Sequence, residues 1–171
     1  FLIFSFVTAI VVIIAGLSIT SRYQSESSGV SEKVVFAGLA EKISDVKTII
    51  VQDKDNSITV NNHENNWVIA DRNNYLASSE TVKNILLGLA ELRLKEPKTE
   101  RAQLYSRLEV EDVTTQNAKS KLIKLKVKNG NTIAELIVGK ETSEIAGASD
   151  VGRYIRKPGE TRSWLAEGRL V

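Results

Sequence analysis

The chain has 171 residues, enough for one domain of ordinary size after its apolar opening. It carries 23 Lys and Arg residues against 21 Asp and Glu residues, and a net charge of +2 argues against a dedicated nucleic-acid-binding protein. The absence of cysteine excludes disulfides, thiolate metal sites and cysteine nucleophiles. His63 is the only imidazole, so a metal site would need carboxylates as its main ligands.

The opening segment, FLIFSFVTAIVVIIAGLSIT (residues 1–20), contains no charged side chain. As a helix it would be about 30 Å long, the thickness of a bilayer's hydrocarbon core. It has no polar face at helical spacing, and it continues past the usual length of a signal-peptide core. We therefore expect an uncleaved transmembrane anchor, with a cleaved signal peptide as the alternative. An N-terminal anchor usually exports a large domain behind it, so we expect the rest of the chain to be extracytoplasmic, in the periplasm.

A spacer and a folded domain follow the apolar segment. Residues 21–33, SRYQSESSGVSEK, are rich in serine and predict a flexible spacer. The remaining residues, 34–171, are long enough to form one domain, and we expect a short helix from Ala37 within residues 34–44.

Residues 45–70 predict a β-meander. The β-branched run at 46–51 is followed by shorter strand-like runs at 57–60 and 67–70. The Asn- and Asp-rich stretches QDKDN and NNHENN separate these runs and are typical of turns. Three short strands in this arrangement favour an antiparallel sheet.

The main helix is expected after Ser78 or Ser79, either of which can cap it. Apolar residues follow at helical spacing, namely Val82, Ile85, Leu86, Leu89 and Leu92. The helix must end before Pro97, because the residue preceding a proline avoids the helical conformation. A second, shorter helix is expected over residues 100–108.

Residues 120–140 predict a β-hairpin. Asn129-Gly130 is typical of a type I′ turn between two strands. In the first strand Ile123, Leu125 and Val127 alternate with lysines, so the apolar set should face a core. Residues 141–150 predict a loop, and residues 152–168 a closing hairpin that turns at Pro158-Gly159. The fold class is therefore α+β: antiparallel hairpins and a meander packed on one main helix, preceded by a single transmembrane helix.

The lysines of the first hairpin are the candidate site residues. Lys121, Lys124, Lys126 and Lys128 could contact anionic headgroups or an acidic polymer close to the membrane. The alternative is a solvated strand face on which lysines prevent edge-to-edge pairing. We assign no catalytic, cofactor-binding or metal-binding residue, and we expect no cofactor and no nucleic-acid partner.

Other constellations have weaker signals. Asp53 and Asp55 resemble the start of a calcium loop, but Ile58 occupies the position that needs glycine. An enzyme acting on envelope material remains an alternative, with Asp53, Asp55, Glu64 or Asp71 as its carboxylates. His63, between two short strands, is expected to be a solvated turn residue.

The two tryptophans have a structural role in this prediction. Trp67 and Trp164 each lie in a predicted strand and are expected to be part of the core.

Several segments of the chain resemble one protein family in their amino-acid sequence and in their order along the chain. They are FAGLAEKISDVKTIIV, NNWVIADRNNYLASSETVKNILLGLAELRLKEPKTE, YSRLEVED, ELIVGK and GRYIRKPGETRSWLAEG, within residues 36–168. The resemblance is to the bacterial domain of unknown function 4340 family. It implies a single N-terminal membrane helix carrying an extracytoplasmic domain, and an association of some members with ABC-type transport components like those of gliding motility.

The resemblance adds three points of detail. Members often have proline where this chain has Ala37 and Leu76, and glycine where it has Glu109, so these departures concern local turn geometry. Members commonly continue past residue 168, which leaves open whether the domain 34–171 is complete at its C-terminal end.

Because no catalytic residue is implied, we expect a non-enzymatic binding or scaffolding domain, auxiliary to ABC permease and ATPase components. A passive spacer that binds headgroups remains a further alternative.

Overall fold

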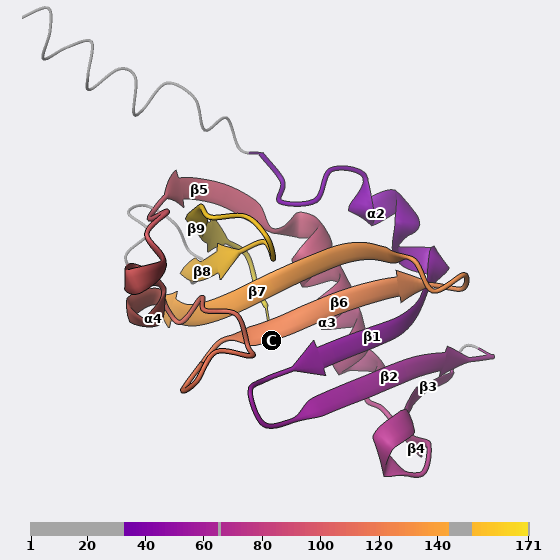
Figure 1. Ribbon diagram of the computed structural model, residues 1–171. Coiled ribbons are helices and arrows are strands. Elements are labelled where there is room, and N and C mark those ends of the chain that lie inside the picture. The colour runs from indigo at the N-terminus through magenta and orange to yellow at the C-terminus, as the bar shows by residue number, and fades with distance from the viewer. Residues whose placement is uncertain (1–32, 65, 144–151, 171) are drawn as a thin grey trace, which may run out of the picture. The chain divides into compact units, whose positions relative to one another are not determined.

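Nine strands form one antiparallel sheet in the computed structural model, which describes residues 33–64, 66–143 and 152–170 (Figure 1). The strand order is β4-β3-β2-β1-β6-β7-β8-β9-β5, and every neighbouring pair is antiparallel. The strands are β1 (Val46–Gln52), β2 (Ser57–His63), β3 (Asn66–Ile69), β4 (Tyr75–Leu76), β5 (Arg93–Pro97), β6 (Lys121–Val127), β7 (Thr132–Thr142), β8 (Gly152–Arg156) and β9 (Ser163–Glu167). The predicted α+β class with antiparallel hairpins is confirmed.

Short helices and 3-10 turns accompany the sheet. The α-helices described are α2 (Leu39–Lys42), α3 (Ser79–Glu91) and α4 (Tyr105–Leu108), and the 3-10 turns are η1 (Ile43–Asp45), η2 (Ala70–Arg72) and η3 (Ala102–Leu104). None of the helices in the described ranges is long and apolar enough to span a bilayer. The expected anchor (residues 1–20) and all of the spacer except Lys33 lie outside the described residues, as does most of the loop predicted at 141–150.

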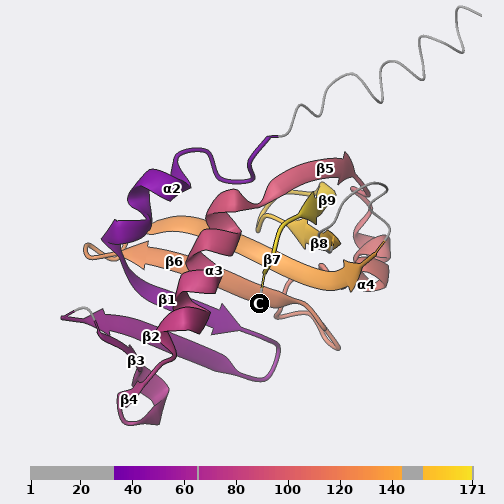
Figure 2. The same ribbon diagram turned by 180° about the vertical axis from the view of Figure 1, so that it is seen from behind.

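Helix α3 lies across one face of the sheet and covers the main core (Figure 2). The Ser78 hydroxyl accepts a hydrogen bond from the Thr81 backbone N–H at 3.3 Å, which confirms the predicted cap. Most of the predicted apolar stripe is buried, and Leu89 and Leu92 are almost fully inaccessible. These side chains pack with Ile49, Leu125, Leu136 and Ile155 from the sheet.

A second, smaller core covers the other face at the β6–β9 end of the sheet. Here α4 and the segment around it pack on the strands, through Tyr105, Val110, Val113, Leu122, Ile137, Tyr154 and Leu165. Leu122 and Ile123 are both buried because the two faces of β6 contact different cores. Tyr154, Ile155 and Arg156 are all buried in β8 for the same reason.

Two turn predictions need correction. The stretch NNHENN is strand as far as His63, so β2 is longer than expected and its turn begins at Glu64. The β6–β7 turn is not type I′, because Gly130 has a φ of 82° while Asn129 is not among the positive-φ residues. The Gly130 N–H donates to the Val127 carbonyl and the Val127 N–H donates to the Asn131 carbonyl. This is a three-residue loop with one left-handed glycine, as in a type I turn followed by a bulge.

The other predicted elements agree with the structure in existence and kind. The helix expected over 100–108 is a 3-10 turn continued by α4, and its C-terminal cap, Glu109, has a φ of 58°. The closing hairpin turns at Gly159, whose φ is 78°. Trp67 and Trp164 are partly buried against the main core, as predicted.

Candidate anion-binding pocket

Two β-bulges lie at the end of the sheet where β6 turns into β7. In the β1–β6 ladder Val46 pairs with Val127 and Thr48 pairs with Lys126, so Lys47 is an extra residue on β1. In the β6–β7 ladder the same kind of shift follows Leu125 and leaves an extra residue on β7. A bulge changes the direction of a side chain and bends its strand, and such features often occur beside binding sites.

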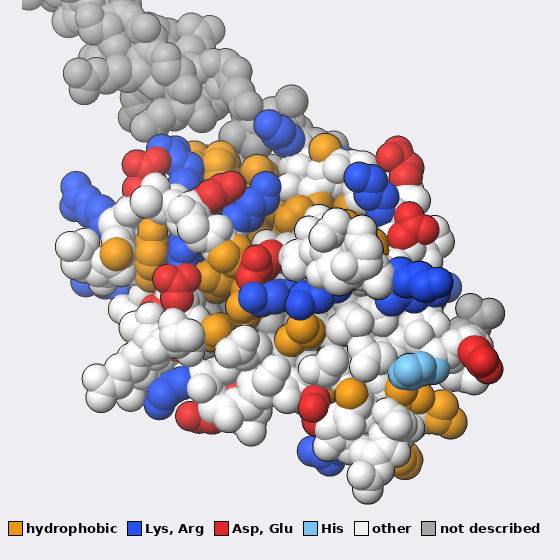
Figure 3. Space-filling model, turned by 45° about the vertical axis from the view of Figure 1, so that its right-hand side comes forward, with side chains coloured by type: hydrophobic (Ala, Val, Ile, Leu, Met, Phe, Trp, Pro, Cys, Tyr) orange, Lys and Arg blue, Asp and Glu red, His pale blue; other side chains and the backbone are white. Residues whose placement is uncertain are grey.

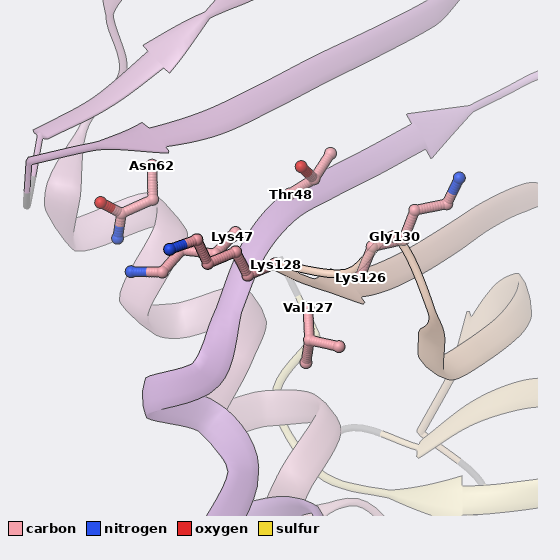
Figure 4. Close-up of a pocket in the computed structure, with 7 residues that line it drawn as sticks. All are labelled: Lys47, Thr48, Asn62, Lys126, Val127, Lys128 and Gly130. Carbon is pink, nitrogen blue, oxygen red and sulfur yellow. The ribbon is translucent and has the colours of Figure 1, made fainter.

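The bulged strands and the turn enclose an open pocket of about 360 Å³. Its lining residues, all drawn in Figure 4, are Lys47, Thr48, Asn62, Lys126, Val127, Lys128 and Gly130. Lys47 and Thr48 come from β1, Asn62 from β2 and the others from the end of β6 and its turn. Segments separated by some 80 residues in the sequence therefore build one site.

The uncharged polar side chains that line the pocket are the Thr48 hydroxyl and the Asn62 amide. The Thr48 hydroxyl donates a hydrogen bond to the Asn61 side-chain carbonyl at 2.9 Å, which fixes the Thr48 rotamer. Asn62, the neighbouring residue on β2, is half-buried at the pocket. In the view of Figure 4 the Lys47 and Lys128 side chains extend to the side where Asn62 lies, whereas Lys126 extends away from them.

The pocket is electropositive. Within the described part of the chain, no ion pair or hydrogen bond engages the ammonium groups of Lys47, Lys126 and Lys128. Figure 3 shows basic side chains gathered in a band across this side of the molecule. Three cations around one hollow, with no counter-ion among the described residues, produce a local positive potential that a bound anion would neutralise.

The four lysines named from the sequence divide into three groups. Lys126 and Lys128 line the pocket. Lys124 is already paired with Glu135 on β7, at 2.7 Å between Nζ and Oε1. Lys121 lies at the other end of β6, about 20 Å from Lys128 along a strand that rises about 3.3 Å per residue. Because successive side chains of a strand alternate between the two faces of the sheet, Lys121 is on the same face as Ile123. Lys124 and Lys126 are on the opposite face.

Sequence reasoning missed Lys47, Thr48 and Asn62. Lys47 stands in the β-branched run DVKTIIV, where it looks like an ordinary strand lysine. Nothing in the local sequence signals the bulge, because a bulge is a property of the pairing between two strands. Asn62 was hidden in a stretch predicted to be a turn.

The carboxylates considered for an enzyme are distributed over separate turns. The Asp53 carboxylate accepts hydrogen bonds from the backbone N–H groups of Asp55 and Asn56, at 2.8 and 2.7 Å, and shapes the β1–β2 turn. These bonds hold the pKa of Asp53 below its ordinary value. Asp71 accepts from the Thr59 backbone N–H at 2.7 Å. Glu64 lies at the far end of β2, about 20 Å from the Asp53 turn at strand spacing.

No metal centre emerges from the described residues. They contain no group of three or more His, Asp or Glu side chains placed to hold a metal ion. His63 is exposed at the end of β2.

The fold and the pocket define an α+β domain built on one antiparallel sheet with a basic pocket at one sheet end. The chain belongs to the family described as Domain of unknown function (DUF4340), whose model matches residues 67–171, more than half of the chain. Residues 36–66, which carry the first part of the resemblance, lie outside that match, and they include Lys47, Thr48 and Asn62. Neither the curated proteins nor the solved structures gave a match.

Proposed function

We propose that this chain is a binding or scaffolding module held at the membrane by residues 1–20, with its folded domain outside the cytoplasm. We further propose that it is auxiliary to an ABC-type transport system, bound to the permease. The uncharged apolar segment and the family resemblance support the location and the transport partner. The observation that carries the binding role is the face of the sheet formed by β2, β1 and the adjoining part of β6, which none of the described helices covers.

This face is opposite α3, and none of the described helices covers it at β1 and β2 (Figure 1). Strand pairing aligns Thr48 with Asn61 and Lys126, and Ile50 with Thr59 and Lys124, across three strands. The face is thus a broad, hydrogen-bonding surface on a rigid scaffold, which suits docking of a protein partner more than conversion of a small substrate.

A photo-crosslinking experiment in cells tests the partner. A photoreactive residue is placed at Ser57, which is exposed and lies on the same face of β2 as Thr59 and Asn61. The matched control carries it at Asn84, which is exposed on α3. We expect an adduct with a transport permease from position 57 and not from position 84. The absence of any adduct from position 57, or equal adducts from both, would contradict the proposed docking face.

Cysteine labelling tests the location. Because the chain has no cysteine, Ser106→Cys on exposed α4 is the only thiol in the protein. We expect a membrane-impermeant maleimide to label it once the outer barrier is opened, while a cytoplasmic thiol reporter in the same cells stays unlabelled until lysis. Protection of Ser106→Cys together with the reporter would place the domain in the cytoplasm and overturn this part of the proposal.

A passive spacer that binds headgroups remains the second candidate, favoured by the three pocket lysines, which have no ion pair among the described residues. It predicts retention of the domain at anionic membranes without any permease adduct.

A further inference from the structure

We infer that the pocket between β1, β2 and the β6–β7 turn binds a phosphoryl group, as free phosphate or as a phosphate monoester. This inference rests on the proposed function in one respect, that the domain is a binding module. Phosphoryl binding by the pocket requires neither the proposed membrane location nor the proposed transport partner.

The charge distribution favours an anion in the pocket. Ion pairs occupy several of the described lysines outside the pocket, such as Lys95 with Glu167 and Lys124 with Glu135. The three pocket lysines have no such partner among the described residues. Like charges held on neighbouring strands destabilise the fold unless an anion offsets them, because their repulsion is least screened where they are partly buried. Lys47 is partly buried, whereas Lys128, which extends to the same side, is exposed.

The backbone positions these cations. Lys47 is the bulged residue of β1, and Lys128 follows β6 in a turn whose left-handed Gly130 forms part of the pocket wall. Because the bulge and the turn depend on strand pairing, the two side chains start from rigid backbone. In Figure 4 they extend to the side of Asn62, so two ammonium groups are available to one ligand. Lys126, which extends the other way, contributes potential at longer range.

The chemistry of the wall suits a phosphoryl group. The wall contains lysines and no arginine, and lysine binds phosphate as a point charge, whereas arginine gives two-pronged recognition of carboxylates and phosphates alike. No aromatic side chain lines the pocket, so it offers no platform on which a nucleic-acid base could stack. A volume of about 360 Å³ exceeds the size of one phosphate and leaves room for a small attached group.

Calorimetry on the full chain in an uncharged detergent tests the inference. The ligands are inorganic phosphate, glycerol 3-phosphate and dihexanoyl phosphatidic acid below its critical micelle concentration, with acetate at equal ionic strength as the monoanion control. We expect binding of the phosphoryl ligands and none of acetate. Tighter binding of the lipid identifies a headgroup as the source, and equal binding identifies a soluble phosphate ligand; both outcomes support the pocket.

Charge variants locate the site. We expect Lys47→Gln and Lys128→Gln each to weaken phosphate binding roughly tenfold, as expected for loss of one close charge, and Lys126→Gln to weaken it less. Lys47→Arg, which keeps the charge, should bind within a few-fold of the parent chain. Lys121→Gln is the matched control at the other end of β6 and should change nothing. Circular dichroism and thermal unfolding verify that each variant is folded.

Three results would overturn the inference: no phosphate binding, binding unaffected by Lys47→Gln and Lys128→Gln in folded chains, or equal weakening by Lys121→Gln. The last would indicate contact along the whole lysine strand instead. None of these results affects crosslinking from Ser57, so failure of the pocket is distinguishable from failure of the proposed docking face.

Discussion

The guanidinium of Arg156 lies over the ring of Tyr105, with its central carbon 4.6 Å from the ring centre. Arg156 is 3% exposed, and it donates hydrogen bonds to the carbonyls of Val110 and Glu160 and to the Asp112 carboxylate, at 2.9, 3.0 and 2.7 Å. One buried side chain on β8 thus joins α4, the segment after it and the closing hairpin.

Replacing Arg156 with leucine should therefore lower the free energy of unfolding by about 3 kcal/mol, because buried carbonyls lose their donors. The measurement is urea denaturation followed by circular dichroism. Arg162→Leu is the matched control, since Arg162 pairs with Glu100 on the exposed surface, and it should cost less than about 1 kcal/mol. Equal losses for both variants would contradict the role given to Arg156.

Gly139 is required by the close approach of α4 to β7. A Cβ atom at this position would lie 2.2 Å from the Leu108 carbonyl oxygen and 2.8 Å from that of Glu109. Gly139→Ala should lower the free energy of unfolding by about 3 kcal/mol, because the backbone must move to make room for the Cβ atom. A Cβ atom at Gly130 would have no atom within 4 Å, so Gly130→Ala adds only the strain of a positive φ. It should lower the free energy of unfolding by about 1 kcal/mol. Thermal unfolding of the two variants checks this order.

Glu109 occupies a left-handed position at the end of α4, with a φ of 58°. A non-glycine residue there costs about 1 kcal/mol, and its contact with Lys119, 3.9 Å between charged atoms, is exposed and weak. Glu109→Gly should therefore raise the free energy of unfolding by about 1 kcal/mol. Glu109→Ala removes the carboxylate and keeps the Cβ atom, and it should give no gain. Stabilisation by alanine as large as by glycine would contradict the backbone explanation.

The cap of α3 depends on one hydroxyl. Ser78→Ala should destabilise the domain by about 1 kcal/mol, because the Thr81 N–H loses its acceptor. Ser79→Ala, one residue into the helix, should be neutral or slightly stabilising because alanine favours helix. Chemical denaturation of both variants checks this. A larger loss of stability in Ser79→Ala than in Ser78→Ala would show that Ser79 is the cap instead.

Asp53 should titrate below its ordinary pKa of 3.8, because its carboxylate accepts backbone hydrogen bonds in the β1–β2 turn. A lowered pKa in the folded state means that the charged form stabilises the fold. That contribution is complete above pH 3.8 and is lost as the pH falls through the lower pKa. Carbon-detected NMR titration of the side chain measures it. Asp55→Pro lacks one of the two donating N–H groups, so the pKa of Asp53 should rise part of the way towards its ordinary value. The bond from Asn56 should keep the rest of the shift.

The elements of this domain were largely predictable because their signals are local. Ser78 followed by apolar residues at helical spacing predicts α3, and alternation of Ile123 and Leu125 with lysines predicts β6. Glycines at 130 and 159 mark the two hairpin turns, although the type of the first turn was wrong. The sequence cannot show that Asn129 keeps a negative φ, since the loop length depends on where the strands begin to pair.

The candidate site was half predictable. Lys126 and Lys128 were visible as a charged strand, but Lys47 became their neighbour only through the β1–β6 register and its bulge. The same register separates Lys121 from the pocket, and the pairing with Glu135 neutralises Lys124. The burial of Arg156 has no local signal, because the second core on the outer face of β8 is formed by a segment about 45 residues earlier.

The sequence by itself determined the α+β class, the main helix, the hairpins and the family, since each depends on residue types at short spacing. Among the described residues, the tertiary structure decided which faces of the sheet are covered, which lysines have no ion pair and where those lysines meet. The physical reason is that strand register and bulges arise from pairing between distant segments, and these contacts are not encoded in the periodicity of either segment alone.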